Sequence, residues 1–230
     1  MEDKKMTLVE HFAELRKRII IIIVFVIIFS VISYIYVEEI IDFLTRIMDE
    51  ELVYISPAEA FLTQIKVSIF AGFIVALPII LYQIWSFVLP ALKKNERKYL
   101  TLLVPVSYIL FLAGTVFALI VIIPFGIRFF LGFSSSDLQA MFSIRNYISF
   151  VIAIVIPFGL VFQLPLLVFF LTKINLINSH LLARKRKYII IIMLLLAAIL
   201  TPPDIISQIM MVVPLLVLYE GSIILAKIIE

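Results

Sequence analysis

The chain contains no cysteine, and only two of its 230 residues are histidine. The absence of cysteine excludes disulfides, thiol chemistry and cysteine-ligated metal sites. The two histidines, His11 and His180, lie far apart in sequence, and no G-x-S-x-G, H-E-x-x-H or P-loop pattern occurs. The sequence therefore nominates no catalytic residue and no metal ligand, and we expect neither enzymatic activity nor a cofactor.

Charged residues are also scarce, at 15% of the chain, whereas 64% of the residues are hydrophobic. A soluble domain usually has about half of its residues apolar. A chain of this size cannot bury so many apolar side chains in one aqueous core, and its mean hydropathy is +1.21. Lipid must therefore be a large part of its solvent, and we expect an integral membrane protein.

Six runs with little or no charge are candidates for membrane spans. A helix needs about 20 apolar residues to cross the hydrocarbon core, and the strict alternation typical of membrane strands is missing. We therefore expect an all-α integral membrane protein with six transmembrane helices in one domain, residues 1–230. The predicted spans are approximately residues 19–37, 67–92, 100–123, 146–172, 188–203 and 205–226.

The last two runs are separated by the sequence TPPD, residues 201–204. Pro202 and Pro203 cannot continue a helix, so a tight turn is expected there, with Asp204 as the N-cap of the final span. The preceding run has 16 uncharged residues, which rise about 24 Å against a hydrocarbon thickness of about 30 Å. We expect a short, shallow hairpin, with these three residues and Glu59 as structural residues of the outer face.

The distribution of lysine and arginine predicts the orientation. With the N-terminus inside, fifteen of the 19 basic residues fall in inner segments. The outer segments hold only Arg46, Lys66, Arg128 and Arg145. The positive-inside rule therefore places both termini in the cytoplasm.

Two outer loops are long enough to contain short helices on the membrane surface. In the first, residues 38–59, an apolar stripe has helical spacing and three acids lie off it. The stripe comprises Ile40, Phe43, Leu44, Ile47 and Met48, and the acids are Glu38, Asp42 and Asp49. The second segment is SSSDLQAMF, residues 134–142, where a serine can cap a helix. Plain connectors are the alternative for both.

Polar residues inside the apolar runs are candidates for function or for helix–helix contact. Gln163 lies in the fourth run between two prolines, and Glu220 lies in the last run, where it can snorkel or pair with Lys227. Gln64 and Gln208, near outer ends, favour helix–helix contact. The prolines within the runs permit kinks and so a curved bundle. No run carries a charge at its middle, which disfavours an ion relay.

Several stretches, in order from about residue 7 to residue 221, resemble the TatC family of the twin-arginine protein translocase. They are HFAELRKR (11–18), SPAEAF (56–61), KVSIFAG (66–72), ALPIILYQIWSFVLPAL (76–92), NERKY (95–99), FGLVFQLP (158–165), ARKRKY (183–188), TPPDIISQ (201–208) and LYE (218–220). TPPD followed by SQ after a short span is specific, whereas HFAELRKR alone would be weak.

This resemblance implies a receptor and core subunit of a system that exports folded proteins across the bacterial cytoplasmic (inner) membrane. It implies recognition of twin-arginine signal peptides on the cytoplasmic face. It also implies single-span partners of the TatA and TatB type, self-association, the lipid bilayer as surroundings and no nucleic acid.

The resemblance also assigns roles to residues. The signal-reading acids of the family match Glu14 and Glu96, with Arg16 in the same motif as Glu14. The family's acid on the fourth span falls at Gln163, where a hydrogen bond to a partner helix can survive but a titratable role cannot. Gln163 and Glu220 are thus expected to contact partner helices.

Three alternatives stay open at this point. Glu14 has a purely structural explanation, an i,i+4 ion pair with Arg18. A secondary transporter of a small solute or ion is the alternative function for the chain. An integral-membrane enzyme is a third class, for which no residue set can be named.

Overall fold

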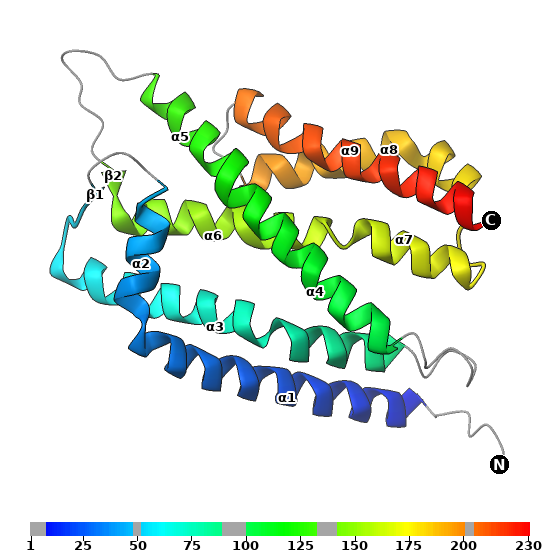
Figure 1. Cartoon of the computed structure of the whole chain (residues 1–230), viewed down its shortest axis with the longest axis horizontal. Helices are drawn as coiled ribbons and strands as arrows, with labels where there is room; N and C mark the ends of the chain where they lie inside the picture. The colour runs from blue at the N-terminus through cyan, green and yellow to red at the C-terminus, as the bar shows by residue number, and fades with distance from the viewer. Residues whose placement is uncertain (1–7, 48–51, 89–99, 133–141, 201–204) are drawn as a thin grey trace. The chain divides into compact units, whose positions relative to one another are not determined.

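A computed structural model describes residues 8–47, 52–88, 100–132, 142–200 and 205–230 (Figure 1). Its helices are α1 (Leu8–Ile35), α2 (Val37–Thr45), α3 (Pro57–Val88), α4 (Leu100–Phe117), the π-helical turn η3 (Ala118–Ile122), α5 (Ile123–Leu131), α6 (Ile144–Val161), α7 (Leu164–Lys173), α8 (Ser179–Leu200) and α9 (Ile205–Ile229). Two-residue strands, β1 (Leu52–Val53) and β2 (Phe142–Ser143), pair in parallel. The predicted all-α class is confirmed apart from this bridge.

Five helical stretches in the described part of the chain are long and apolar enough to cross a membrane. They are Val9–Ile35, Pro57–Phe87, Leu102–Leu131, Ile144–Lys173 and Met211–Ile229. The predicted span at residues 188–203 is not among them. Its described residues, 188–200, belong to α8, whose first half carries the basic run Arg184–Lys187, so that only residues 188–200 of this helix are uncharged. The membrane-protein class is therefore supported, and five of the six predicted spans correspond to candidate spans among the described residues.

The chain divides into two compact units. The first comprises Met1–Phe43 and Pro57–Tyr108, and the second comprises Leu44–Ser56 and Ile109–Glu230.

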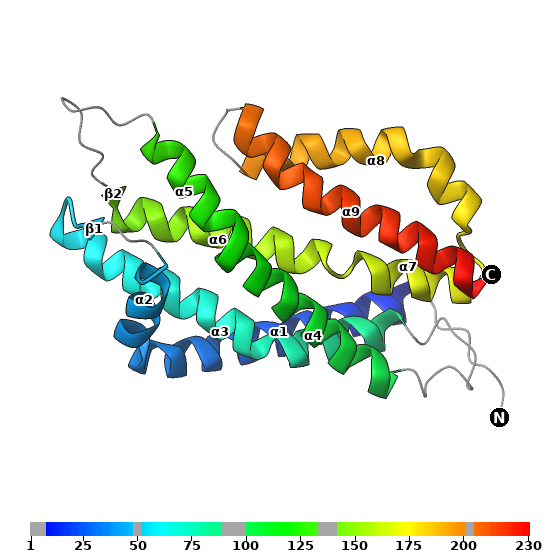
Figure 2. The same ribbon diagram turned by 45° about the horizontal axis from the view of Figure 1, so that its top comes forward.

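In the first unit α1 and α3 run side by side (Figures 1 and 2). Gly72 of α3 lies against the backbone of α1 at Ser30, where a Cβ on residue 72 would stand 2.6 Å from the Ser30 Cα. Ser30 turns its own hydroxyl back to the Val26 carbonyl, at 2.7 Å. Small residues allow such close helix contact in membrane proteins, where dispersion contacts drive helix association.

A methyl group at residue 72 should separate these two helices. We expect Gly72→Ala to lower the free energy of unfolding by about 1–3 kcal/mol, the usual cost of overpacking, although alanine is the better helix former. Gly221→Ala is the matched control, because no atom lies within 4 Å of a Cβ built there. Thermal melts of the two purified variants in detergent test the contact. If the Gly72→Ala and Gly221→Ala proteins had the same melting temperature, the close contact between α1 and α3 at Gly72 would be contradicted.

The short helix α2 confirms part of the prediction for the first outer loop. Glu38 and Asp42 are exposed, as expected. The buried face, however, consists of Val37, Ile41 and Leu44, whereas Phe43 is 60% exposed. Of these three residues the predicted stripe contained only Leu44, because Val37 and Ile41 are buried against the rest of the protein, which the spacing of apolar residues along one helix does not show. The second predicted outer helix, residues 134–142, lies almost wholly outside the described residues.

In the second unit two glycines allow the second half of α4 to approach α6. A Cβ at Gly159 would meet the ring of Phe111, and one at Gly114 would meet the Phe158 carbonyl. Phe111 and Phe158 are both fully buried. These contacts place the aromatic core of the unit at the α4–α6 interface.

Two prolines interrupt helices in this unit. Pro124 cannot donate a backbone hydrogen bond, and the helix widens into η3 just before it, with the Ile123 N–H bound to the Ala118 carbonyl. Pro165 follows the break between α6 and α7 at Phe162 and Gln163. The predicted fourth span is therefore two helices in succession. Pro78, Pro105, Pro157 and Pro214 lie inside helices.

Helices α8 and α9 are separate helices packed together, as the TPPD sequence predicted. The Gln208 amide donates to the Leu194 carbonyl at 2.8 Å, and the Tyr219 hydroxyl donates to the Leu182 carbonyl at 2.8 Å. The first bond confirms Gln208 as a helix–helix contact. The turn itself, with Pro202, Pro203 and Asp204, lies outside the described residues.

The end of α9 contacts the start of α8 through Glu230. Its carboxylate accepts hydrogen bonds from the Ser179 hydroxyl, at 2.7 Å, and from the Ser179 backbone N–H. These bonds, that of the hydroxyl foremost, hold the pKa of Glu230 below its usual value of 4.5. A carboxyl group with a lowered pKa contributes stability above its unfolded-state pKa.

We therefore expect the Ser179–Glu230 contact to weaken as the pH falls below 4.5 through the lowered pKa. Hydrogen exchange of the Ser179 amide, corrected for its intrinsic rate, should accelerate in that range. Glu230→Gln is the control, since its amide does not titrate. Equal acceleration in both proteins would show that another group is responsible.

Candidate functional site

The candidate site begins with an ion pair on α1 between two residues that lie one helical turn apart. Glu14 Oε1 accepts hydrogen bonds from Arg18 Nη2 at 2.5 Å and from Arg18 Nε at 3.1 Å. The side chains are 21% and 18% exposed. The structural alternative for Glu14, an i,i+4 pair, is therefore confirmed as a contact. It does not decide what else the carboxylate binds.

Arg18 also connects α1 to α3. Its Nη1 donates to the side-chain oxygen of Gln83 at 3.0 Å, and its Nη2 donates to the Ser86 carbonyl at 3.2 Å. A guanidinium group presents its donors in a fixed planar fork, so contacts on three sides leave it little freedom. Arg18 therefore holds the Glu14 carboxylate in place against the end of α3.

The second carboxylate oxygen of Glu14 is buried and accepts no hydrogen bond from the described residues. An ionised carboxylate can accept about four hydrogen bonds, and a buried oxygen without a donor is destabilising. The arrangement thus has a fixed negative group with unused acceptor capacity. A cation with N–H donors would complete it.

Aromatic side chains make further contacts at the end of α3. The His11 ring stacks on Phe87, with centroids 4.3 Å apart and planes 21° apart. On α3, the Trp85 indole donates to the Ser107 hydroxyl of α4 at 2.9 Å. These contacts fix the end of α3, on which the Gln83 and Ser86 acceptors lie.

Of the remaining members of the predicted signal-binding and outer-face sets, only Arg16 and Glu59 lie among the described residues. Arg16 is exposed on α1 and takes no part in the Arg18 contacts. Glu59 is 5% exposed at the start of α3. Glu96 lies outside the described residues, as do Asp204 and the two prolines before it.

The two predicted partner contacts have different surroundings. Gln163 is half-buried at the break between α6 and α7, where its carbonyl accepts from the Leu167 N–H at 2.9 Å. Glu220 pairs with Arg186 of α8 at 2.7 Å, with both side chains 48% exposed. Of the two options left open by the sequence, to snorkel or to pair with Lys227, neither named this partner, which the packing of α9 on α8 brings to Glu220.

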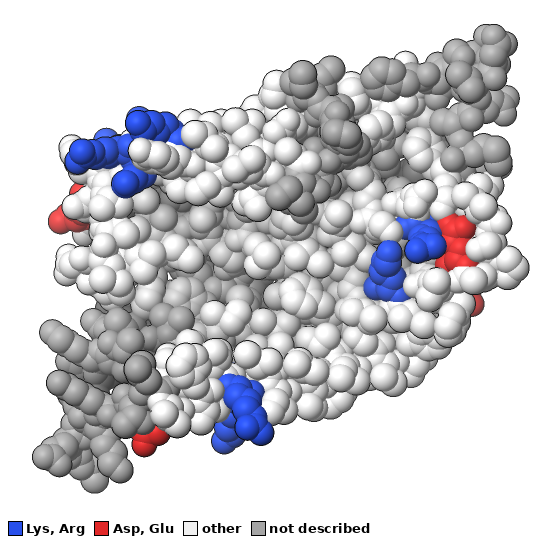
Figure 3. Space-filling model, turned by 180° about the vertical axis from the view of Figure 1, so that it is seen from behind, with Lys and Arg blue, Asp and Glu red and all other residues white. Residues whose placement is uncertain are grey.

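Sequence reasoning missed Gln83 and Ser86. Gln83 is a polar residue inside the second predicted span, which was the available signal, whereas Ser86 accepts through its backbone carbonyl, which no residue type announces. Their role depends on the register of α1 against α3, which no local pattern shows. On the face shown in Figure 3, the coloured charged side chains of the described residues form separate groups.

Comparison with known proteins gives one consistent result. Residues 10–214 match the sequence model of the family described as Sec-independent protein translocase protein (TatC). The TatC protein of Carboxydothermus hydrogenoformans is 47% identical over 234 aligned positions, covering 100% of this chain and 96% of the relative. The TatCd protein of Bacillus subtilis is 34% identical, covering 98% of this chain and 93% of the relative.

A crystal structure described as that of the twin-arginine translocase receptor TatC is similar throughout. Its TM-score is 0.86 at 38% sequence identity, and the match covers 96% of this chain and 99% of that one. Sequence and fold therefore agree over nearly the whole length. The chain belongs to the TatC family of Sec-independent protein translocase proteins.

Proposed function

We propose that this translocase subunit binds the arginine pair of twin-arginine signal peptides at Glu14, and that Glu96 is the second acid of the site. The observation that carries the proposal is the Glu14 carboxylate, half-buried, fixed by Arg18 and with one oxygen that accepts no bond from the described residues. A relative of similar fold is described as a twin-arginine translocase receptor.

The chemistry of the arginine side chain supports this role. A guanidinium group offers two parallel N–H donors to a carboxylate, and such charge-assisted bonds are about twice as strong as neutral ones. Arg18 uses Oε1, so a peptide arginine would take Oε2 after local movement of the side chains that cover it. Exposed Arg16 and Lys17 on the same helix would repel any cation. Only a cation that gains the two parallel bonds would overcome this repulsion.

The orientation of the chain follows from the same proposal. With both termini cytoplasmic in the bacterial inner membrane, Glu14, residues 89–99 and the basic run of α8 share the cytoplasmic side. The uncharged part of α8 would be the short sixth span of a single curved six-helix domain. The start of α3 with Glu59 and the Pro202–Asp204 turn would then lie at the outer face, with α2 on the membrane surface.

Partner subunits are proposed to contact the chain at two polar positions. Gln163 is a half-buried polar residue at the helix break between α6 and α7, and amide side chains of this kind form hydrogen bonds between membrane helices. Glu220 is exposed and charged near the cytoplasmic end of α9. Single-span helices of the TatA and TatB type and further copies of this chain are the proposed partners.

The test is a binding measurement on the purified wild-type protein in nanodiscs. A peptide with an arginine pair should bind more tightly than the same peptide with two lysines, which keeps the charge but loses the planar fork. Affinity should fall as salt rises, because the site is partly exposed. Equal affinity for both peptides would contradict the proposal. Solute flux through the protein without partners would instead support a transporter.

A further inference from the structure

The start of α8 carries a group of cations that the proposed peptide site does not use. The basic run comprises Arg184, Lys185, Arg186 and Lys187. Arg186 is paired with Glu220. Among the described residues the other three form no ion pair. Figure 3 shows a compact group of lysine and arginine at one end of the face that includes α8.

Two of these cations are held by one aromatic ring. The ammonium nitrogens of Lys185 and Lys187 each lie 5.1 Å from the centroid of the Tyr188 ring. They can therefore be no farther apart than twice that distance. A cation over an aromatic face keeps its N–H donors free for an acceptor on its other side.

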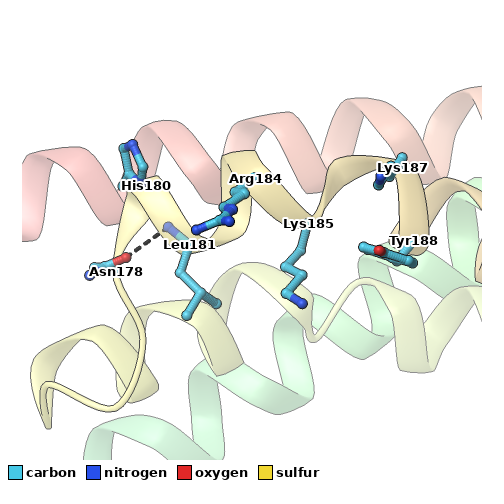
Figure 4. A pocket seen from close by; sticks show the side chains of 7 residues that line it. All are labelled: Asn178, His180, Leu181, Arg184, Lys185, Lys187 and Tyr188. Atoms are coloured by element: carbon cyan, nitrogen blue, oxygen red, sulfur yellow. Dashed lines mark hydrogen bonds between the residues drawn. The ribbon is translucent and has the colours of Figure 1, made fainter.

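The cations line a cavity of about 580 Å³. Its lining includes Arg184, Lys185, Lys187 and Tyr188, with His180 and Asn178 at the α7–α8 end. Figure 4 shows Lys185 extending away from the helix, and Lys187 next to Tyr188. Asn178 is committed to capping α8, since its side-chain oxygen accepts from the Leu181 N–H at 2.7 Å. Among the described residues no carboxylate lines this cavity, so the charge of its known lining is positive.

An apolar stripe continues from the cavity along the same face of α8. Arg184, Tyr188, Ile191 and Leu195 follow one another at intervals of three or four residues, which places them on one helix face. Tyr188, Ile191 and Leu195 are all exposed. A ligand that fits both parts needs an anionic head and an apolar tail.

We propose that this cavity binds the phosphate head group of an anionic phospholipid, whose acyl chain lies along the exposed stripe of α8. Lysine and arginine supply charge-assisted bonds to the phosphate oxygens. Tyrosine is the residue type that prefers the boundary between head groups and hydrocarbon. The site shares no residue with the proposed peptide site and does not depend on peptide recognition.

Native mass spectrometry of the purified full chain tests the site, with phosphatidylglycerol and phosphatidylcholine of identical acyl chains as probes. We expect selective retention of phosphatidylglycerol. Replacing both Arg184→Gln and Lys185→Gln should weaken its binding by roughly 25-fold, about fivefold for each cation removed. The control is Lys17→Gln with Arg46→Gln, which removes the same charge from exposed positions outside the cavity and should leave retention unchanged.

Two results would overturn the proposal. One is equal retention of phosphatidylglycerol by the paired variant and its control. The other is displacement of the lipid by an equal concentration of soluble glycerol phosphate, because the site would then bind free phosphate and not a lipid. If the double variant does not fold, the same measurement is made on Lys187→Gln, for which we expect phosphatidylglycerol to bind about fivefold more weakly.

Discussion

Glu14→Gln should weaken the binding of a twin-arginine peptide by about 10- to 100-fold, the effect of losing one hydrogen-bonded charge of about 1.5–3 kcal/mol. Glutamine keeps the size of the side chain and one acceptor oxygen, so the helix contact to Arg18 can survive in part. The measurement is peptide affinity for the purified variant in nanodiscs, and Glu96→Gln is measured in parallel.

The control for this experiment lies on the same helix. Glu10→Gln removes an exposed negative charge one turn before Glu14 and should change peptide affinity little. A general loss of electrostatic attraction would affect both variants equally, whereas a bound arginine pair would affect Glu14 alone. If Glu14→Gln binds as tightly as wild type, Glu14 has only its structural role as the partner of Arg18.

Arg18→Met should lower the free energy of unfolding by about 2 kcal/mol, less than the 3–5 kcal/mol typical of a fully buried pair because this one is partly exposed. The substitution keeps an unbranched side chain but removes the hydrogen bonds to Glu14, Gln83 and Ser86. The Glu14 carboxylate is then left without its cation. Thermal or denaturant unfolding in detergent measures the change.

A double-mutant cycle separates the ion pair from the other contacts of Arg18. In Glu14→Gln combined with Arg18→Met no charge is left unpaired, so the loss should be smaller than the sum of the two single losses. Lys17→Met is the matched control, since Lys17 is exposed on the same turn and should have little effect. Additive losses would contradict coupling between Glu14 and Arg18.

The sequence by itself determined the class of protein and most helix positions. Long runs without charge can only be helices in lipid, because a helix satisfies its own backbone hydrogen bonds. Paired prolines end a helix wherever they occur, which separated α8 from α9. The i,i+4 spacing of Glu14 and Arg18 likewise predicts their contact, because it follows from helix geometry alone.

Helix faces and helix ends were less predictable. In α2 the burial of Ile41 and exposure of Phe43 depend on what packs against the helix, and both residues are equally apolar. Pro124 and Pro165 both lack a backbone N–H, so each predicted an irregular position. The structure has a π turn before Pro124 and a helix break before Pro165, and the sequence did not show which would occur at which proline.

Only the tertiary structure decided which polar groups meet. Arg18 reaches Gln83 and Ser86 because Gly72 lets α3 approach α1 in one register, and these residues are 65 and 68 positions apart in the chain. Glu220 pairs with Arg186 for the same reason, through the packing of α9 on α8. Contacts within one helix follow from its fixed geometry, whereas contacts between helices depend on how their surfaces fit, which no local pattern contains.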